Sequence, residues 1–147
     1  MSLQEQIKGD LKQAMLAKDK ARVGTLRLLM AEIKQVEVDT RTTLADADIV
    51  AVIAKMVKQR KDAISQFESA GRQDLADAEQ AEIGVLQCFL PQPLSEAELD
   101  QLIDATLAEL GVSGMQAMGQ VMNTLRPKVQ GRVDMGALSA KIKARLA

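Results

Sequence analysis

The chain has 147 residues, 47% of them apolar, and a formal net charge of −1. Its mean hydropathy of −0.05 argues against a disordered chain, and no run of about 18 apolar residues predicts a transmembrane helix. The sequence contains no histidine, which excludes a histidine-based catalytic triad and a histidine-containing zinc site.

The residue types favour helices throughout the chain. Ala, Leu, Met, Gln, Lys and Glu, the strong helix formers, dominate, and Phe67 and Phe89 are the only aromatic residues. No run alternates polar and apolar residues as a half-buried strand would. We therefore predict an all-α protein of seven helices whose core consists of Leu, Ile, Val, Ala and Met.

The first two predicted helices form an antiparallel pair, because only the short polar turn 18–20 separates them. Ser2 and Glu5 have the spacing of a capping box that starts the first helix. Apolar residues in this helix recur every four positions, at Leu3, Ile7, Leu11 and Met15. Those of the second helix are Val23, Leu26, Leu29, Met30, Ile33 and Val36.

The third and fourth predicted helices end at residues that interrupt helices. We expect Thr43 and Asp46 to cap the third helix and Gly71 to end it. Its apolar stripe is Ile49, Ile53, Met56, Ile64 and Phe67. The fourth helix carries Leu75, Ile83, Leu86 and Leu90, and Pro91 ends it.

The segment 91–94, with Pro91 and Pro93, predicts a short, stiff linker. We therefore expect a larger N-terminal helical bundle over 1–90 and a small C-terminal three-helix domain over 95–147. Its helices are expected to be capped by Ser95 with Glu98, by Ser113 with Gln116, and by Asp134. Gly111 should end the first of them, and Pro127 should kink or stop the second.

The charges divide unevenly along the chain. Residues 1–110 hold 13 Lys/Arg and 19 Asp/Glu, whereas residues 111–147 hold six Lys/Arg and one acidic residue, Asp134. Such an excess can mark a part of the chain that meets an anion. The candidate nucleic-acid-binding residues are therefore Arg126, Lys128, Arg132, Lys141, Lys143 and Arg145.

Lys128 and Arg132 flank Gly131, beside the predicted start of the last helix, where free backbone N–H groups favour phosphate. The alternative is a solvated polar face with cations near a helix C-terminus. No aromatic residue follows Phe89, so an RNA contact there would recognise shape and phosphate rather than stack on bases.

Several motifs resemble those of the YqeY-like family. The most specific is the run KQRKDAISQFESAGRQDLA at 58–76, followed by EQAEI at 79–83 and LPQ at 90–92. Further matches are LSEAEL at 94–99, MGQVM at 118–122 and GRVD at 131–134. The resemblance covers nearly the whole chain; the departures, at Ala45, Pro93 and Val133, remove no candidate site.

The resemblance implies two all-α subdomains and kinship of the C-terminal one with the tail of the B subunit (GatB) of the tRNA-dependent amidotransferase. That tail is associated with tRNA binding, while the chemistry takes place in other domains and subunits. The resemblance also carries a label of carbon–nitrogen ligase activity with glutamine as amide donor. We do not expect that activity from this chain alone, because it lacks the domains that would perform it.

Four other features have a functional and a plainer structural interpretation. Cys88, the single thiol, has no histidine to activate it, and we expect its side chain to be buried as a small apolar residue. A single cysteine also fits a reducing, cytoplasmic environment. Arg60 lies in register with the apolar stripe of its helix and would pair with a carboxylate of another helix or, alternatively, bind an anion. The acidic pairs are expected to lie at helix starts or on solvated faces rather than to hold a metal; they are Asp46/Asp48, Asp74/Asp77 and Glu79/Glu82.

The methionines of the C-terminal domain could line an adaptable groove for a protein partner or could fill the core of that domain. They are Met115, Met118, Met122 and Met135. We therefore carry three hypotheses: a non-catalytic accessory protein that binds tRNA or another structured RNA, a protein–protein adaptor, and a component of an amidotransferase complex. None of them requires catalytic residues, a metal, a cofactor or a membrane.

Overall fold

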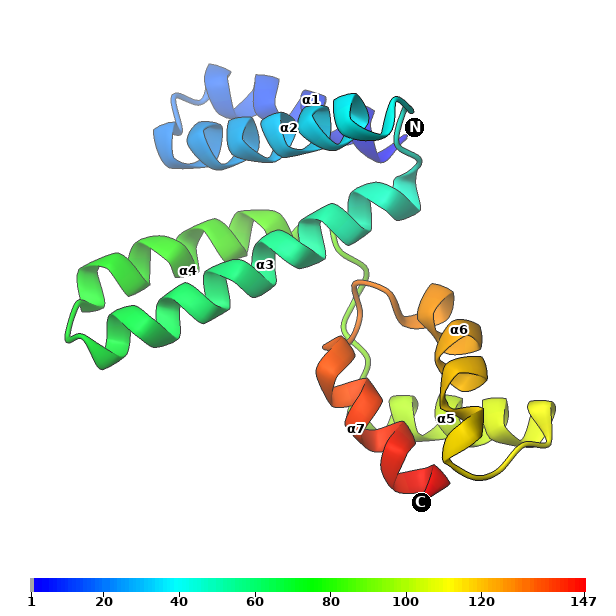
Figure 1. Ribbon diagram of the computed structural model, residues 1–147. Helices are drawn as coiled ribbons and strands as arrows, with labels where there is room; N and C mark the ends of the chain where they lie inside the picture. The colour runs from blue at the N-terminus through cyan, green and yellow to red at the C-terminus, as the bar shows by residue number, and fades with distance from the viewer. Residues whose placement is uncertain (1) are drawn as a thin grey trace. The chain divides into compact units, whose positions relative to one another are not determined.

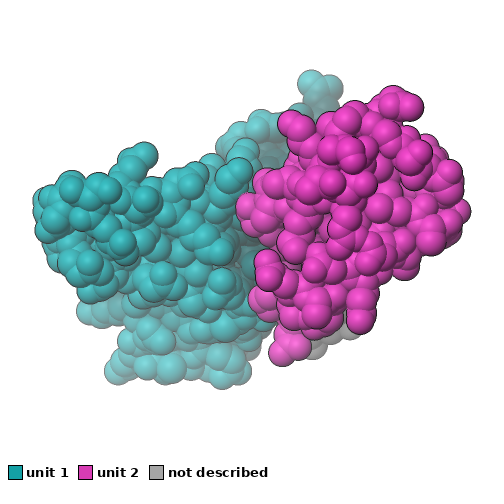
Figure 2. Space-filling model, turned by 90° about the horizontal axis from the view of Figure 1, so that it is seen from below, with its two compact units in different colours: residues 1–90 teal, residues 91–147 magenta. Residues whose placement is uncertain are grey.

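The structure, a computed structural model, describes residues 2–147. These residues form seven α-helices and one short 3-10 helix, and no strand occurs among them. The prediction of an all-α protein is therefore confirmed. The helices fall into two compact units, residues 1–90 and residues 91–147, which Figure 2 shows in separate colours.

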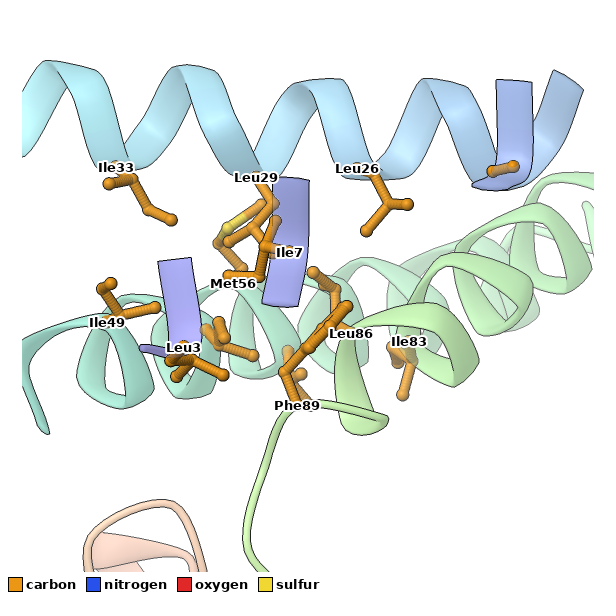
Figure 3. Packing of buried hydrophobic residues seen from close by; sticks show 13 residues of the cluster. Leu3, Ile7, Leu26, Leu29, Ile33, Ile49, Met56, Ile83, Leu86 and Phe89 are labelled. Carbon is orange, nitrogen blue, oxygen red and sulfur yellow. The ribbon is translucent and has the colours of Figure 1, made fainter. Parts of the chain in front are cut away.

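The N-terminal unit consists of two helical hairpins in two layers (Figure 1). The helices are α1 (Leu3–Leu16), α2 (Lys20–Thr40), α3 (Asp46–Ser69) and α4 (Gln73–Gln87). Figure 3 shows side chains of α2 pointing across the interface toward Met56 of α3 and Leu86 of α4. The α2 side chains are Leu26, Leu29 and Ile33, all completely buried, so this interface holds the core of the unit.

One predicted core residue lies on the surface. Met15 is 51% exposed, and Ala14 takes the buried position instead. An α-helix has about 3.6 residues per turn, so a spacing of four drifts by about 40° at each step. After three steps from Leu3, Met15 has therefore rotated away from the face that Leu3 and Ile7 bury.

The start of α3 also differs from its prediction. Ala45, not Thr43 or Asp46, is the N-cap, and it makes no side-chain capping bond. Its own N–H donates to Oδ2 of Asp48 at 3.1 Å. Asp46 is the first residue of the helix, and its Oδ1 accepts a hydrogen bond from the N–H of Leu3 at 3.0 Å. Its carboxylate thus ties the start of α1 to the start of α3.

The C-terminal unit contains α5 (Glu96–Leu110), the 3-10 helix η1 (Met115–Ala117), α6 (Met118–Val129) and α7 (Met135–Leu146). The capping predictions for Ser95, Asp134 and Gly111 are confirmed: Ser95 accepts from the N–H of Glu98, Asp134 accepts from the N–H of Ala137, and Gly111 is left-handed. Residues from all three α-helices form one core, including Leu99, Ile103, Val121, Leu125, Leu138 and Ile142.

The second helix of this unit begins differently from its prediction, and it is not stopped by Pro127, one of the two effects predicted for that proline. Ser113 does not cap it, because the chain first forms η1 after Gly114, which has a φ of 84°. Pro127 does not end α6, which continues to Val129. A proline removes only its own hydrogen bond to the carbonyl four residues earlier, and residues after it can still make theirs; the N–H of Gln130 donates to the carbonyl of Arg126 at 3.0 Å.

The proline segment 91–94 is attached to the C-terminal unit. The N–H of Leu94 donates to the carbonyl of Arg132 at 2.9 Å. Nε of Arg132 donates to the carbonyl of Gln92 at 2.8 Å. These bonds hold the segment against the turn between α6 and α7. Among the described residues, no helix is long and apolar enough to cross a membrane.

Candidate functional site

Two of the six candidate RNA-binding cations form ion pairs between α7 and α5. Nζ of Lys141 lies 2.9 Å from Oδ1 of Asp100 and 3.7 Å from Oε1 of Glu96. Arg145 pairs with Asp100 at 3.5 Å and also with Asp104. Both cations therefore hold the helices of the unit together, and less of their charge is available to a phosphate.

The Lys141–Asp100 contact alters the ionisation of both groups. The hydrogen bond from Lys141 is the main cause that lowers the pKa of Asp100 below its usual value, although desolvation opposes it. The same hydrogen bond raises the pKa of Lys141 against desolvation. Each charged form stabilises the other, as expected for a paired carboxylate and ammonium group.

Three cations remain exposed and make no ion pair within residues 2–147: Arg126, Lys128 and Lys143. Arg126 and Lys128 lie in the last turn of α6, close in sequence to Arg132 in the turn that leads to α7. Lys143 lies in the last turn of α7. Because a short turn joins the antiparallel α6 and α7 (Figure 1), Lys143 lies at the opposite end of this helix pair.

The six cations therefore do not form one surface. The structure brings Arg126, Lys128 and Arg132 to one end of the unit, where Arg132 is half-buried and uses Nε to hold Gln92. A candidate phosphate-binding surface therefore contains three of the six cations that the sequence suggests. We define the basic turn as these three residues.

The charge asymmetry disappears when the charges are counted by structural unit. Helix α5 carries five acidic residues and no Lys or Arg, and it belongs with α6 and α7. The C-terminal unit consequently holds six Lys/Arg and six Asp/Glu, and the N-terminal unit holds 13 and 14. The positive excess of residues 111–147 is therefore not an excess of the C-terminal unit, because that unit also includes the acidic helix α5, which lies before residue 111.

The structure supports the interpretation of Arg60 as a residue that pairs between helices. Its Nε donates to Oε2 of Glu82 on α4 at 2.8 Å, and Glu79 lies 4.0 Å away. Its Nη1 donates to the carbonyl of Met56 at 3.2 Å. The Arg60 side chain is only 14% exposed, so this contact connects α3 and α4 at the edge of the core.

The prediction that Cys88 is buried is wrong. Cys88 is exposed, and its Sγ donates to the carbonyl of Gly84 at 3.4 Å. The buried residues at this end of α4 are Ile83, Leu86 and Phe89. Their spacing of three places Cys88 on the opposite side of the chain from the core.

The acidic pairs have structural partners. Asp46 and Asp48 accept backbone hydrogen bonds at the start of α3, and Asp77 accepts from Gln73 at 2.8 Å. A hydrogen bond from Arg72 lowers the pKa of Asp74. Within residues 2–147, no group of three His, Cys, Asp or Glu side chains is placed to hold a metal ion.

The methionines of the C-terminal unit mostly fill its core. Met118, Met122 and Met135 are half-buried and pack against the apolar cluster of the unit. Met115 is the exposed member, at 43%. This packing agrees with the plainer interpretation for Met118, Met122 and Met135, whereas Met115 does not fill the core.

Cations other than the six candidates gather in the N-terminal unit, where Lys18, Lys20 and Arg27 lie around the turn between α1 and α2. Residues 8–27 contain six Lys/Arg and two Asp. The net negative charge of residues 1–110 conceals this local excess of Lys and Arg. A count over a window of about 20 residues would have found it.

The chain is similar to a family profile and to proteins of known sequence. A profile of the family described as Yqey-like protein matches residues 4–146. The chain is 32% identical over 140 residues to "Altered inheritance of mitochondria protein 41, mitochondrial" of Pyrenophora tritici-repentis (strain Pt-1C-BFP); the match covers 93% of this chain and 77% of that protein.

Proteins of the same name in two yeasts are also similar. The Saccharomyces cerevisiae (strain YJM789) protein is 30% identical over 140 residues, covering 93% of this chain and 73% of that protein. The Lachancea thermotolerans (strain ATCC 56472 / CBS 6340 / NRRL Y-8284) protein is 39% identical over 107 residues, or 71% of this chain and 57% of that protein.

Proposed function

Because the chain belongs to the YqeY-like protein family, we propose that it is a non-catalytic accessory protein that binds tRNA or another structured RNA through its C-terminal unit. The proposal draws on the resemblance of this unit to the tail of the amidotransferase B subunit. The observation that carries it is the basic turn: Arg126 and Lys128 are exposed without an ion-pair partner among the described residues, and they lie close in sequence to Arg132.

The basic turn limits how strong such binding can be. Each neutralised phosphate releases counterions and adds about 0.7 to 0.9 to the slope of log affinity against log salt. Three cations therefore correspond to a slope of about 2 to 3. A unit with six cations and six acidic residues adds no wider positive field, so we expect weak binding that depends on shape and is sensitive to salt.

A filter-binding titration of bulk tRNA at several salt concentrations tests the proposal. The double variant Arg126→Glu with Lys128→Glu should weaken binding by about tenfold or more and reduce the salt slope by about 1 to 2. Arg132 is left unchanged because its hydrogen bond to Gln92 supports the fold. The matched control is Lys58→Glu with Lys61→Glu, which makes the same charge change on exposed residues of α3.

Equal weakening by both double variants would show only a general charge effect and would contradict the proposal. The single variant Lys143→Glu measures how far the binding surface extends. Unchanged binding confines the site to the basic turn, whereas weakening comparable to the double variant would contradict that confinement. Far-UV circular dichroism confirms that each variant remains helical.

Association with an amidotransferase is a separate part of the proposal. Affinity purification of the full chain, with and without nuclease, distinguishes the two kinds of partner. Partners lost on nuclease treatment support binding through RNA, while an amidase-type subunit retained after treatment supports a protein complex. We propose a reducing compartment, the cytoplasm, since the exposed Cys88 is a free thiol; the names of the fungal relatives make mitochondria the alternative result of fractionation.

A further inference from the structure

Residues of α1, α2 and the turn between them line a shallow apolar hollow at one end of the α1–α2 hairpin. Figure 1 shows the turn that joins the two helices. Met15, Val23 and Gly24 form the apolar surface of the hollow, and Lys18, Lys20 and Arg27 surround it. Leu16 and Leu28 of the same hairpin are also exposed, at 69% and 49%.

Gly24 keeps the hollow open. Lys20, Gly24 and Arg27 share one face of α2, since they are spaced by four and three residues. A Cβ atom added at Gly24 would meet nothing within 4 Å. No neighbour therefore requires glycine here, although glycine inside a helix costs about 1 kcal/mol relative to alanine. The missing side chain leaves room for a side chain from another molecule.

The charge around the hollow is not balanced by the hairpin itself. Of the two acidic residues within 8–27, Asp10 pairs with Arg22 at 3.5 Å and Asp19 caps α2 through the N–H of Arg22. Lys18, Lys20 and Arg27 make no ion pair within residues 2–147. A ligand for this surface should therefore combine an apolar group with negative charge.

We propose that this hollow binds an acidic amphipathic helix of a partner protein, which inserts an apolar side chain over Gly24 and directs Asp or Glu residues to Lys18, Lys20 and Arg27. Helices bind such sites through apolar anchors at positions i, i+3 or i+4 and i+7. The concave apolar surface does not suit RNA, which would leave it uncovered. The acidic helix α5 of the chain already buries Leu99 and Ile103 in its own unit, so the ligand comes from another protein.

Selection from a displayed library of random peptides of about 16 residues, with the full-length protein as bait, tests the proposal. We expect the selected peptides to carry helically spaced apolar residues flanked by Asp or Glu. A synthetic peptide of the consensus should bind Gly24→Leu at least about tenfold more weakly, because the leucine fills the hollow. Lys20→Glu with Arg27→Glu should weaken binding of the same peptide and should not make the salt dependence of that binding steeper.

The matched control is Gly84→Leu, another exposed helical glycine with nothing within 4 Å of an added Cβ atom; it should leave peptide affinity unchanged. The proposal is overturned if no peptide is selected, if the peptides lack acidic residues, or if Gly24→Leu and Gly84→Leu behave alike. Anionic phospholipid vesicles and bulk tRNA are tested in parallel. Binding of either that Gly24→Leu weakens more than it weakens peptide binding would assign the hollow to that ligand instead.

This proposal is independent of RNA binding by the C-terminal unit. Gly24→Leu should leave tRNA affinity unchanged, and Arg126→Glu with Lys128→Glu should leave peptide affinity unchanged. The proposal of peptide binding at the hollow and the proposal of RNA binding by the C-terminal unit can therefore each be contradicted without the other.

Discussion

Nζ of Lys141 lies 2.9 Å from Oδ1 of Asp100, a contact that connects α7 to α5 across 41 positions of sequence. Arg145 reaches the same carboxylate at 3.5 Å. The contact uses two of the cations that made the end of the chain look like an RNA-binding surface. It also explains how an acidic helix and a basic helix form a unit whose charges balance.

Asp100→Asn should destabilise the C-terminal unit in a pH-dependent manner. The pKa of Asp100 is lowered, so its contribution is present above the usual Asp value of about 4 and is lost as pH falls through the lowered pKa. The pKa of Lys141 is raised, so its contribution is present below the usual value of about 10.4 and is lost as pH rises through the raised pKa.

The difference in Tm between wild type and Asp100→Asn should therefore be constant between about pH 5 and 9 and should shrink at both extremes. Thermal unfolding followed by circular dichroism across this range measures it. A difference that grows toward acid would show that the carboxylate is not stabilised in its ionised form.

Arg60→Met should lower the free energy of unfolding by about 1 to 2 kcal/mol, because it leaves Glu82 without its partner at the edge of the core. The double variant Arg60→Met with Glu82→Gln should recover part of the loss, since the unpaired carboxylate is removed. Urea denaturation of the wild type, Arg60→Met, Glu82→Gln and the double variant measures the coupling between the two side chains. Additive losses in the double variant would mean that the two side chains do not interact.

Ala45→Ser should stabilise the N-terminal unit by about 0.5 to 1 kcal/mol, because the N-cap of α3 lacks a side-chain acceptor. The backbone at Ala45, with φ of −78° and ψ of 167°, is already in the extended conformation that a serine cap uses. The control is Ala70→Ser at the other end of α3, where a serine meets no free N–H groups. Equal changes at the two positions in urea denaturation would rule out a capping effect.

Ile7→Ala should lower the free energy of unfolding by about 2 to 4 kcal/mol, because Ile7 is completely buried against α2 and α3. Met15→Ala should change it by no more than about 0.5 kcal/mol, since Met15 is half exposed. Chemical denaturation of the two variants compares these positions directly. Similar losses would mean that both residues of the four-residue repeat face the core.

The helices and most of their ends follow from local sequence. The capping box of Ser2 and Glu5, the caps at Ser95 and Asp134, and the left-handed Gly111 are all read within three or four residues. Such interactions join near neighbours, so the order of residues along the chain already contains them. The family resemblance was also visible in the order of residues.

The pairing of charges depended on the tertiary structure. Arg60 meets Glu82 from 22 positions away and Lys141 meets Asp100 from 41 positions away, and no local pattern indicates which carboxylate a cation will find. Burial at Met15 and Cys88 depended on small rotations at helix ends, which a repeat of four does not resolve. The packing of α5 with α6 and α7 therefore decided whether the six cations at the end of the chain formed a positive surface. It places six acidic residues in the same unit, so the charges of the unit balance in number.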